Sequence, residues 1–492
     1  MEITYKGVLI IIVLLLLSAG FYERTVAQSD DLILEWEQHW ETYGKGGTCN
    51  YGTHNFYVGD IDNDETIELV TGGYQYYNME NSTRINFQAP LRIWNWNGEK
   101  FTCEKSHNWA GSIHSTYAYD LDNDGFREII TGGIVTDRTN MTSAIRIWDY
   151  DGENIAQKGE YKGVSTGSIY VIDINDDGIP EVLTAGRVSD QNRSLAQLSI
   201  FQWKNNNLFF RKSVEWCTSN EAHAYSVYAH DLDNDGKIEI ITGGYDNDLL
   251  NSSGQLRVWR WNGEEITLEA NKEWRLVEGV CGVTNSGQPM GNTMVNNVKV
   301  GDVDSDGVPE IITGGWTYDG EKTNAQLRIW NWNGLELILE KSFEWISEDI
   351  TDIKSISLDD VDKDGDMEIV TSGITAVYGG FNNPLSTPDH AQLRILSWKE
   401  KTLKLEQSKD WTIGEGVAAW NIATEDIDND GTVEIITVGC MGESGLCDPD
   451  LRIWSLNIKN NSVSTIFVAA VILGIVIVVI AIYLISKLGS QK

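Results

Sequence analysis

The chain has 492 residues, a formal net charge of −36 and a hydrophobic fraction of 41%. This apolar content excludes an intrinsically disordered chain, and the acidic balance excludes nucleic acid as a partner, because contacts to phosphates need clusters of Lys and Arg. With 47 Gly, 19 Trp and 19 Tyr but only 7 Pro, the composition favours a protein of strands and turns over a helical bundle.

The first predicted element is an apolar run at residues 8–19, which follows Lys6 and precedes the small-residue pair Val26 and Ala27. The run is too short to span a bilayer comfortably, and a small-residue pair is typical of a signal-peptide cleavage site. Residues 1–27 are therefore interpreted as a signal peptide, with an uncleaved membrane anchor as the alternative.

An acidic motif then recurs seven times, about every 60 residues. Each copy carries Asp or Asn at positions one, three and five and Glu at position nine, and six of the seven copies have Gly at position six. In chain order these residues are Asp60, Asp62, Asp64 and Glu68; Asp120, Asp122, Asp124 and Glu128; Asp173, Asn175, Asp177 and Glu181; Asp231, Asp233, Asp235 and Glu239; Asp302, Asp304, Asp306 and Glu310; Asp360, Asp362, Asp364 and Glu368; and Asp426, Asp428, Asp430 and Glu434.

Strand patterns flank every motif. An apolar run after the Glu ends in Thr and Gly, as at residues 129–133, and a polar loop follows. Next come a strand such as 327–332, the dipeptide Asn-Gly and a strand such as 337–345. Asn-Gly between two alternating segments is typical of a hairpin. Each repeat is therefore predicted to be four antiparallel strands, with the acidic loop joining the first strand to the second.

Seven such sheets in series predict an all-β fold, a seven-bladed β-propeller of four-stranded antiparallel blades over residues 32–457. The seventh repeat stops before its fourth strand, and residues 32–40 resemble that missing strand when compared with 337–345. The N-terminal strand is expected to pair with blade seven and close the ring.

The acidic loops have the spacing of a calcium site. Position two is apolar in all seven loops, so it faces the core while the oxygen side chains at one, three and five converge outward. A backbone carbonyl at position seven and the Glu at nine can complete the shell. The helix-flanked calcium loop is excluded, because its bidentate Glu belongs at position twelve, where the second repeat has Thr131.

We expect up to seven Ca²⁺, since Mg²⁺ would prefer a smaller site with more water. The alternative is a set of plain solvated turns rich in Asp and Asn. This alternative has most weight for the first loop, where Glu65 replaces the glycine.

The seven loops resemble the FG-GAP and VCBS repeats of the integrin α-subunit propeller and of many bacterial and archaeal surface proteins. The resemblance covers residues 32 to about 457. It implies calcium binding at loop positions one, three, five and nine, and each of these positions carries an oxygen side chain here. The integrin leg domains and cytoplasmic motif have no counterpart in this sequence, so integrin signalling is not implied. The family also includes polysaccharide lyases, so the fold alone settles no activity.

Residues 466–485 carry no charged side chain, and a helix of that length spans about 30 Å of bilayer. Lys487 and Lys492 follow, which predicts a cytoplasmic tail at 486–492 and an outward location for everything before the helix. The expected arrangement is a stalk at 458–465, a transmembrane helix at 466–485 and single-pass anchoring in the cell membrane.

Cysteines and sequons supply further candidate sites. Cys440 and Cys447 bracket a Gly-rich loop and form the best candidate disulfide on the oxidising side of a membrane, with free buried thiols as the alternative. Candidate glycosylation sites are Asn81, Asn140, Asn192 and Asn251, in loops of blades one to four, and Asn460 in the stalk.

Candidate ligand contacts come from a position six residues before each first Asp, which is expected near the mouth of the central channel. His54, His114, Lys354 and Trp420 are among the residues at this position, and the alternative is that they merely begin the first strand of a blade. Trp316 is a further candidate, because it breaks the pattern in which other Trp residues recur with the repeat. The recurring Trp residues are expected to pack between blades.

No serine-centred elbow, zinc-type His spacing or Gly-rich phosphate loop stands out, so no catalytic residue is assigned. The pattern predicts a membrane-anchored extracellular calcium propeller for binding or adhesion at the cell surface, with an extracellular protein or glycan as ligand. The alternatives are an extracellular polysaccharide lyase or hydrolase and a structural component of a cell-envelope array.

Overall fold

The structure of the chain is a computed structural model. It describes residues 32–39, 55–78, 85–137, 140–190, 193–218, 220–247, 252–275, 282–283, 289–290, 293–319, 321–377, 390–413, 417–441 and 448–457. All regular elements in these residues are β-strands, so the predicted all-β class is confirmed. None of these residues belongs to a helix long and apolar enough to cross a membrane. The expected signal peptide, stalk, transmembrane helix and tail all lie outside the described residues.

The strands are grouped around the seven acidic loops, and the strands around one loop are called a unit. Unit one contains β2 (Asn55–Gly59), β3 (Glu68–Gly72), β4 (Gln75–Asn78), β5 (Ile85–Trp96) and the first half of β6 (Phe101–Tyr119). Unit two contains the second half of β6, β7 (Glu128–Asp137), β8 (Asn140–Tyr150) and β9 (Ile155–Lys162). Unit three contains β10 (Ser168–Ile172), β11 (Glu181–Asp190), β12 (Arg193–Lys204) and β13 (Asn207–Trp216).

The remaining units repeat this order. Unit four contains β14 (Glu221–His230), β15 (Glu239–Asn247), β16 (Ser252–Trp261) and β17 (Ile266–Trp274), and a short pair follows, β18 (Gly282–Val283) with β19 (Pro289–Met290). Unit five contains β20 (Thr293–Gly301), β21 (Glu310–Tyr318), β22 (Thr323–Trp332) and β23 (Leu337–Trp345). Unit six contains β24 (Ile350–Asp359), β25 (Glu368–Ala376), β26 (His390–Lys399) and β27 (Thr402–Trp411). Unit seven contains β28 (Val417–Glu425), β29 (Glu434–Met441) and β30 (Asp448–Leu456).

Strands within a unit pair antiparallel, as the hairpin signals predict, and in unit one both β3 and β4 pair with β5. Units one and two share one sheet because β6 runs through both. Units three and four are joined by a short parallel contact of Ser194 with Glu221, and units five and six by the same contact of Thr323 with Ile350.

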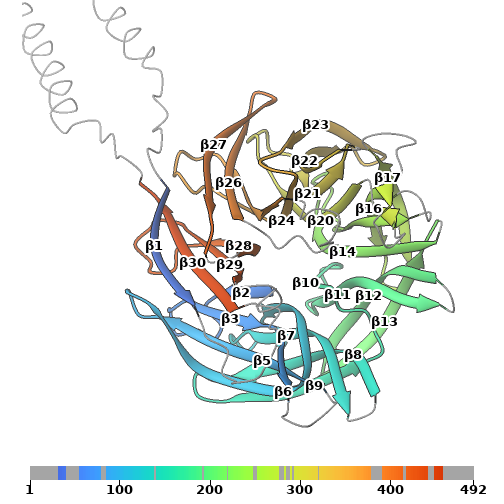
Figure 1. The fold of residues 1–492 in the computed structure, drawn as a ribbon. Helices are drawn as coiled ribbons and strands as arrows, with labels where there is room; N and C mark the ends of the chain where they lie inside the picture. Colours follow the sequence, from blue (N-terminus) through green and yellow to red (C-terminus); the bar gives the residue numbers. More distant parts are fainter. Residues whose placement is uncertain are drawn as a thin grey trace, which may run out of the picture. The chain divides into compact units, whose positions relative to one another are not determined.

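The N-terminal strand β1 (Leu32–His39) is the fourth strand of the unit seven sheet, whose order is β1-β30-β29-β28. Figure 1 shows β1 alongside β30, although the two come from opposite ends of the sequence. Glu37 forms an ion pair with Arg452 at 2.9 Å. On the other side, the Trp36 ring packs edge-on against Trp96 and Phe101 of unit one, with centroid distances of 5.9 and 5.8 Å. Strand β1 therefore contacts both unit seven and unit one.

The first strand of each unit lies innermost. Each of these strands, β2, the second half of β6, β10, β14, β20, β24 and β28, contacts the first strand of the next unit, and β28 contacts β2 (Figure 1). All seven contribute residues to one cavity of about 320 Å³. The order of contacts among the first strands is thus closed.

The recurring Trp residues pack between successive units, as predicted from their period. Trp109 of unit one lies against Trp148 of unit two at a centroid distance of 4.9 Å, and the Arg146 guanidinium lies 5.0 Å from the Trp109 ring. Equivalent ring pairs recur at Trp216 with Trp259, Trp274 with Trp330, and Trp411 with Trp454. These aromatic contacts make the units one continuous packed body.

Candidate metal centres

Each acidic loop folds around its first Asp. In unit two, Oδ1 of Asp120 accepts a hydrogen bond from the backbone N–H of Asp124 at 3.1 Å, and Oδ2 accepts one from Gly125 at 3.0 Å. Oδ1 of Asp124 accepts a bond from the N–H of Phe126 at 2.9 Å. The two bonds to the first Asp recur in the other six loops. Local hydrogen bonds between the Asp side chains and the backbone therefore give every motif the same tight loop.

The Glu at position nine is the first residue of the second strand, and it reaches back to the loop. In unit two, Oε2 of Glu128 accepts a hydrogen bond from the backbone N–H of Leu121 at 2.8 Å. The same bond occurs in units one, three, four, five and seven. Leu121 and its six equivalents are buried, as the apolar position two predicts. The core thus anchors the loop while the Glu is held beside the Asp residues.

The loops bring carboxylates together closely. In each of the following groups, one oxygen from every side chain lies within 4.8 Å of the others: Asp60, Asp62 and Glu68; Asp120, Asp122 and Glu128; Asp231, Asp233 and Glu239; Asp302, Asp304 and Asp306; and Asp360, Asp362 and Glu368. Like charges this close repel one another unless a proton or a cation lies between them.

Some of these oxygens are buried without a hydrogen-bond donor among the described residues. They are Oδ1 of Asp62, Asp233 and Asp304, Oε1 of Glu310 and Oε2 of Glu368. A buried carboxylate oxygen without a donor is costly, whereas Ca²⁺ takes six to eight oxygen ligands from side chains of this type. This set of oxygen ligands therefore fits a hard divalent cation.

The pKa values of the position-nine Glu side chains are raised by burial and by the nearby carboxylates. Burial raises the pKa of Glu68, Glu128, Glu181 and Glu239 to about 7. Burial, with added repulsion from loop Asp residues, raises the pKa of Glu310 and Glu434 to about 8 and that of Glu368 to about 9. Without a bound cation, these loops hold their carboxylates under electrostatic strain.

The first loop forms like the others despite Glu65 at position six. Its backbone N–H donates to Oδ2 of Asp60 at 3.1 Å, as the glycines do in the other loops. Its φ is 72°, and the equivalent glycines, Gly125, Gly178, Gly236, Gly307, Gly365 and Gly431, have φ between 79° and 94°. A side chain at such φ is strained by about 1 kcal/mol or more.

Replacing Glu65 by Gly is therefore expected to stabilise the chain by about 1 kcal/mol, because it removes this strain. Thermal unfolding at a fixed calcium concentration measures the effect. Glu65→Gln is the control, since it removes the charge but keeps the strained backbone. Equal stability of the two variants would mean that charge, not backbone conformation, limits the first loop.

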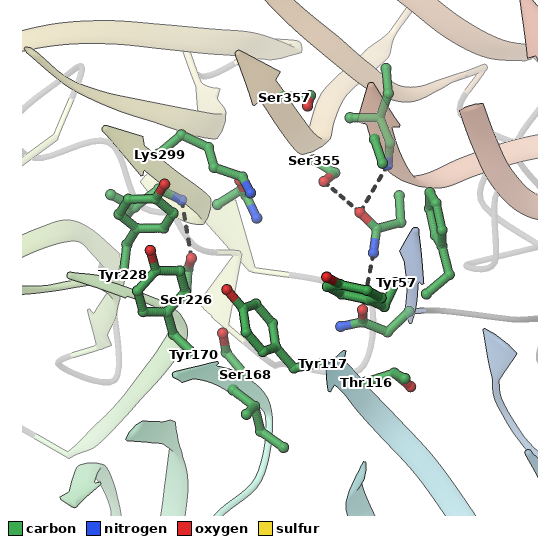
Figure 2. A pocket seen from close by; sticks show the side chains of 18 of the residues that line it. Tyr57, Thr116, Tyr117, Ser168, Tyr170, Ser226, Tyr228, Lys299, Ser355 and Ser357 are labelled. Carbon is green, nitrogen blue, oxygen red and sulfur yellow. Dashed lines mark hydrogen bonds between the residues drawn. The ribbon is translucent and has the colours of Figure 1, made fainter. Parts of the chain in front are cut away.

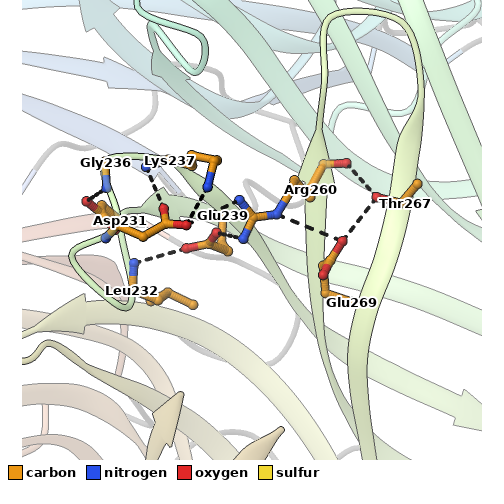
Figure 3. Close-up of polar contacts among 9 residues, drawn as sticks. Asp231, Leu232, Gly236, Lys237, Glu239, Arg260, Thr267 and Glu269 are labelled. Atoms are coloured by element: carbon orange, nitrogen blue, oxygen red, sulfur yellow. Dashed lines mark hydrogen bonds and ion pairs between the residues drawn. The ribbon is translucent and has the colours of Figure 1, made fainter. Parts of the chain in front are cut away.

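The fourth loop has basic side chains among its carboxylates, which the motif did not reveal (Figure 3). Nζ of Lys237 lies 2.6 Å from Oδ2 of Asp235, and Nη2 of Arg260 lies 2.6 Å from Oε1 of Glu239. Arg260 is on β16 directly opposite Glu239, and Nε of Arg260 also lies 3.9 Å from Glu269 on β17. The fourth loop therefore has part of its negative charge already neutralised.

The residue opposite the position-nine Glu differs between units. In unit three it is Gln202, whose Nε2 donates to Oε1 of Glu181 at 2.8 Å without adding charge. In unit six a basic residue approaches from elsewhere, since Nζ of Lys399 lies 2.6 Å from Asp364 and 2.8 Å from Asp366. The loops share one backbone but differ in local charge.

Two of the candidate ligand contacts lie together. The Lys354 ammonium lies 5.0 Å from the centre of the Trp420 ring and 2.5 Å from Oδ2 of buried Asp352. Asn296 also donates to Asp352, at 2.8 Å. Lys354 is thus already paired with a carboxylate. His114 bonds to Ser112, Trp316 lies on β21, and His54 is outside the described residues.

The position six residues before the first Asp is a β-bulge in five units. The register of the first strand skips His114, Tyr225, Asn296, Lys354 and Trp420. These residues lie within the first strand of each of these units, not at its start. The bulge explains the second glycine of the Thr-Gly-Gly runs, because a Cβ on Gly133 would lie 2.0 Å from the carbonyl oxygen of Ser112.

Cys440 is disulfide-bonded, and its predicted partner Cys447 lies outside the described residues. Asn140 is exposed at the start of β8, which is compatible with modification. The other four sequons, at Asn81, Asn192, Asn251 and Asn460, lie outside the described residues.

A second group of residues was missed at the level of sequence. Tyr57, Tyr117, Tyr170, Tyr228 and Lys299 line the central cavity (Figure 2). These residues share a position in the repeat, three residues before the first Asp. That position lies outside the acidic motif, so the motif did not point to them.

The comparisons with known proteins concern the repeat. A family described as FG-GAP-like repeat matches residues 173–242, from the first Asp of the third loop into β15, the strand that follows the fourth loop. The crystal structure of Sqt1 from Chaetomium thermophilum is similar over 87% of this chain and 85% of that chain, with 11% identity and a TM-score of 0.46. No curated protein sequence matches the chain. The resemblance carried by the acidic motifs is thus confirmed for residues 173–242, which match the FG-GAP-like repeat.

Proposed function

We propose that the chain is a membrane-anchored, seven-bladed β-propeller that binds Ca²⁺ in its acidic loops and recognises an extracellular protein or glycan at the cell surface. Each unit would be one blade. The closed order of contacts among the first strands supports the propeller, and so does β1, which supplies the fourth strand of unit seven. The FG-GAP-like repeat at residues 173–242 supports an extracellular type of domain.

The calcium proposal rests on the buried carboxylate oxygens without hydrogen-bond donors, which the described residues show in loops one, four, five and six. The side chains at positions one, three, five and nine would hold the ion, with the backbone carbonyl at seven as a further ligand. Bound Ca²⁺ would supply the positive charge that keeps these carboxylates ionised inside a tight loop. The resulting rigid loops would hold the blade edges in place for ligand binding.

Membrane anchoring rests on the apolar segment at residues 466–485 and on the Lys residues that follow it. An outward propeller near a membrane is well placed to meet a ligand outside the cell. Lys354 with Trp420, and Trp316 on β21, remain our proposed ligand contacts, because they combine an ammonium group with partly exposed aromatic rings.

The test of this function is a binding screen with the full-length chain on glycan and cell-surface protein arrays, in about 1 mM Ca²⁺ and in excess chelator. We expect a ligand that is retained with Ca²⁺ and lost with chelator. Replacing Trp316 and Trp420 by Ala should weaken its binding at least about tenfold without lowering the melting temperature. Full binding by that double variant would rule out these contacts as the ligand-binding site. Polysaccharide cleavage by the purified chain would instead favour the alternative function as a lyase or hydrolase.

The fourth loop is expected to bind Ca²⁺ more weakly than it would without Arg260, because the guanidinium competes with the ion for Glu239. Arg260→Gln recreates the arrangement of unit three, where Gln202 faces Glu181. The variant should bind the ion at this loop about tenfold more tightly, since a like charge at this distance contributes on the order of 1 to 4 kcal/mol. Calcium titration calorimetry measures this, with exposed Arg211→Gln as the control. Unchanged calcium affinity in Arg260→Gln would contradict the competition.

A further inference from the structure

The central cavity has the size of a small-molecule site. It is enclosed by the first strands of all seven units and has a volume of about 320 Å³, which lies in the range of small-ligand pockets. Its lining comes mainly from two positions of the repeat, five and three residues before the first Asp. Neither position belongs to the calcium loops or to the bulged residues.

The position five residues before the first Asp forms a rigid polar wall. Oγ of Ser168 accepts a hydrogen bond from the backbone N–H of Val227 at 3.2 Å, and Oγ of Ser226 accepts one from Val298 at 3.1 Å. Oγ of Ser355 donates to Oδ1 of Asn421 at 2.7 Å. These bonds join neighbouring units across the cavity wall, so its shape is set before any ligand arrives.

The position three residues before the first Asp gives the cavity two different sides, one lined by tyrosines and the other by smaller or charged residues. Tyr57, Tyr117, Tyr170 and Tyr228 follow one another in units one to four, with centroid distances of 5.7, 5.5 and 4.5 Å between neighbours (Figure 2). Burial raises the pKa of all four, so their hydroxyls stay protonated and can donate hydrogen bonds. Units five, six and seven carry Lys299, Ser357 and Ala423 at this position.

Among the described residues that line the cavity, Lys299 is the one with a charged side chain, although the chain has 73 Asp and Glu. Its ammonium lies 5.5 Å from the centre of the Tyr228 ring. No hydrogen bond or ion pair joins it to any residue in the described part of the chain. Burial lowers the pKa of Lys299, because removing the ammonium from water disfavours its charged form. A half-buried cation that faces a cavity without a counter-charge favours an anion as occupant.

We propose that this cavity binds a small organic acid of about the size of one sugar ring, with a single carboxylate on Lys299 and its ring against the tyrosine side. The hydroxyl-rich wall of Ser and Tyr side chains suits a ligand that itself carries hydroxyl groups. The site is separate from the calcium loops and from the proposed ligand contacts around Trp420. The propeller would therefore have an internal small-molecule site as well as its surface ligand.

The experiment is isothermal titration of the full-length chain in about 1 mM Ca²⁺ with four probes: glucuronate, glucose, acetate and sulfate. Glucuronate should bind one site per chain at least about tenfold more tightly than the other three, because only it has both the carboxylate and the hydroxylated ring. Lys299→Gln should weaken glucuronate binding at least about tenfold. Lys272→Gln, the same change on the exposed strand β17, should leave it unaltered.

A filling variant keeps the test decisive if Lys299→Gln does not fold. Ala423→Tyr continues the tyrosine row in unit seven and should abolish glucuronate binding by occupying the cavity, with an unchanged melting temperature. The proposal is overturned if glucuronate does not bind at about 10 mM, or if sulfate binds as tightly. It is equally overturned if the folded Lys299→Gln chain binds glucuronate like the parent. Neither surface-ligand binding nor calcium affinity enters these outcomes, so they are independent of the proposed function.

Discussion

Removing Ca²⁺ from the full-length chain is expected to lower its melting temperature by about 5 to 10 °C. Extracellular modules bind Ca²⁺ with dissociation constants of about 10⁻⁴ to 10⁻³ M, so at about 1 mM free ion each site adds about 0.4 to 1.4 kcal/mol through linkage. Seven independent sites would add about 3 to 10 kcal/mol, comparable to the whole stability of a typical domain. Superimposable melting curves in Ca²⁺ and in chelator would refute the metal assignment.

The metal-free chain should also lose stability as the pH rises. The position-nine Glu side chains have folded-state pKa values of about 7 to 9, above the ordinary value of 4.5. Between about pH 4.5 and pH 8 the folded state therefore binds more protons than the unfolded chain, and the free energy of unfolding falls with rising pH. Below pH 4.5 both states hold the protons, and this loss is absent.

Melting curves of dialysed, metal-free chain at about pH 5.5 and pH 8 test this sign, and a parallel series in about 1 mM Ca²⁺ is the control. The metal-free chain should melt lower at pH 8, and Ca²⁺ should stabilise it most at that pH. A metal-free melting temperature that rises from pH 5.5 to pH 8 would contradict the raised pKa values of these buried carboxyls.

The effect of a single loop substitution on the stability of the chain should change sign when calcium is removed. Asp304→Ala removes a carboxylate whose Oδ1 is buried without a donor among the described residues. In Ca²⁺ it should destabilise the chain by about 1 kcal/mol through loss of the site, and in chelator it should stabilise it by relieving repulsion from Asp306. Asp190→Ala, at an exposed strand end, is the control and should show neither effect.

Deleting β1 is expected to have the second large effect. A chain that begins at Gly44 lacks the strand next to β30, so it exposes an unpaired strand edge and uncovers Trp96 and Phe101. Exposed edges of this kind template association between chains, so we expect aggregation during gel filtration and a melting temperature at least about 10 °C lower. Arg452 would also lose its ion pair with Glu37.

A chain that begins at Asp31 is the matched control, because it removes the same leader but keeps β1. Addition of a synthetic peptide of residues 32–40 to the shorter chain should restore part of its stability, since the peptide can pair with β30. The shorter chain remaining monomeric, with the melting temperature of the control, would show that β1 is dispensable for the ring.

Much of the loop architecture is predictable from sequence, because it depends on short-range contacts. Asp120 accepts hydrogen bonds from Asp124 and Gly125, and Glu128 accepts one from Leu121. Each joins residues less than eight positions apart in the sequence. The alternating segments and Asn-Gly turns likewise predict hairpins from neighbouring residues. The position of β1 beside β30 followed from a missing fourth strand in a repeat count, which is a long-range contact that periodicity alone makes visible.

Other features of the sites depend on strands brought together across units or across a sheet. Arg260 reaches Glu239 only because the register of β15 and β16 places them opposite each other. Lys354 lies at a bulge in the first strand of unit six, and its ammonium lies over the Trp420 ring of the next unit.

The sequence by itself determined the strand order, the seven loops and their carboxylate sets, since each is written within one repeat and held by local hydrogen bonds. Only the tertiary structure decided what the repeats enclose. Lys299 and Tyr57 are far apart in the chain, and neither belongs to a recognisable motif. They line one cavity because the first strands pack side by side around it, and that closure is a property of the assembled units.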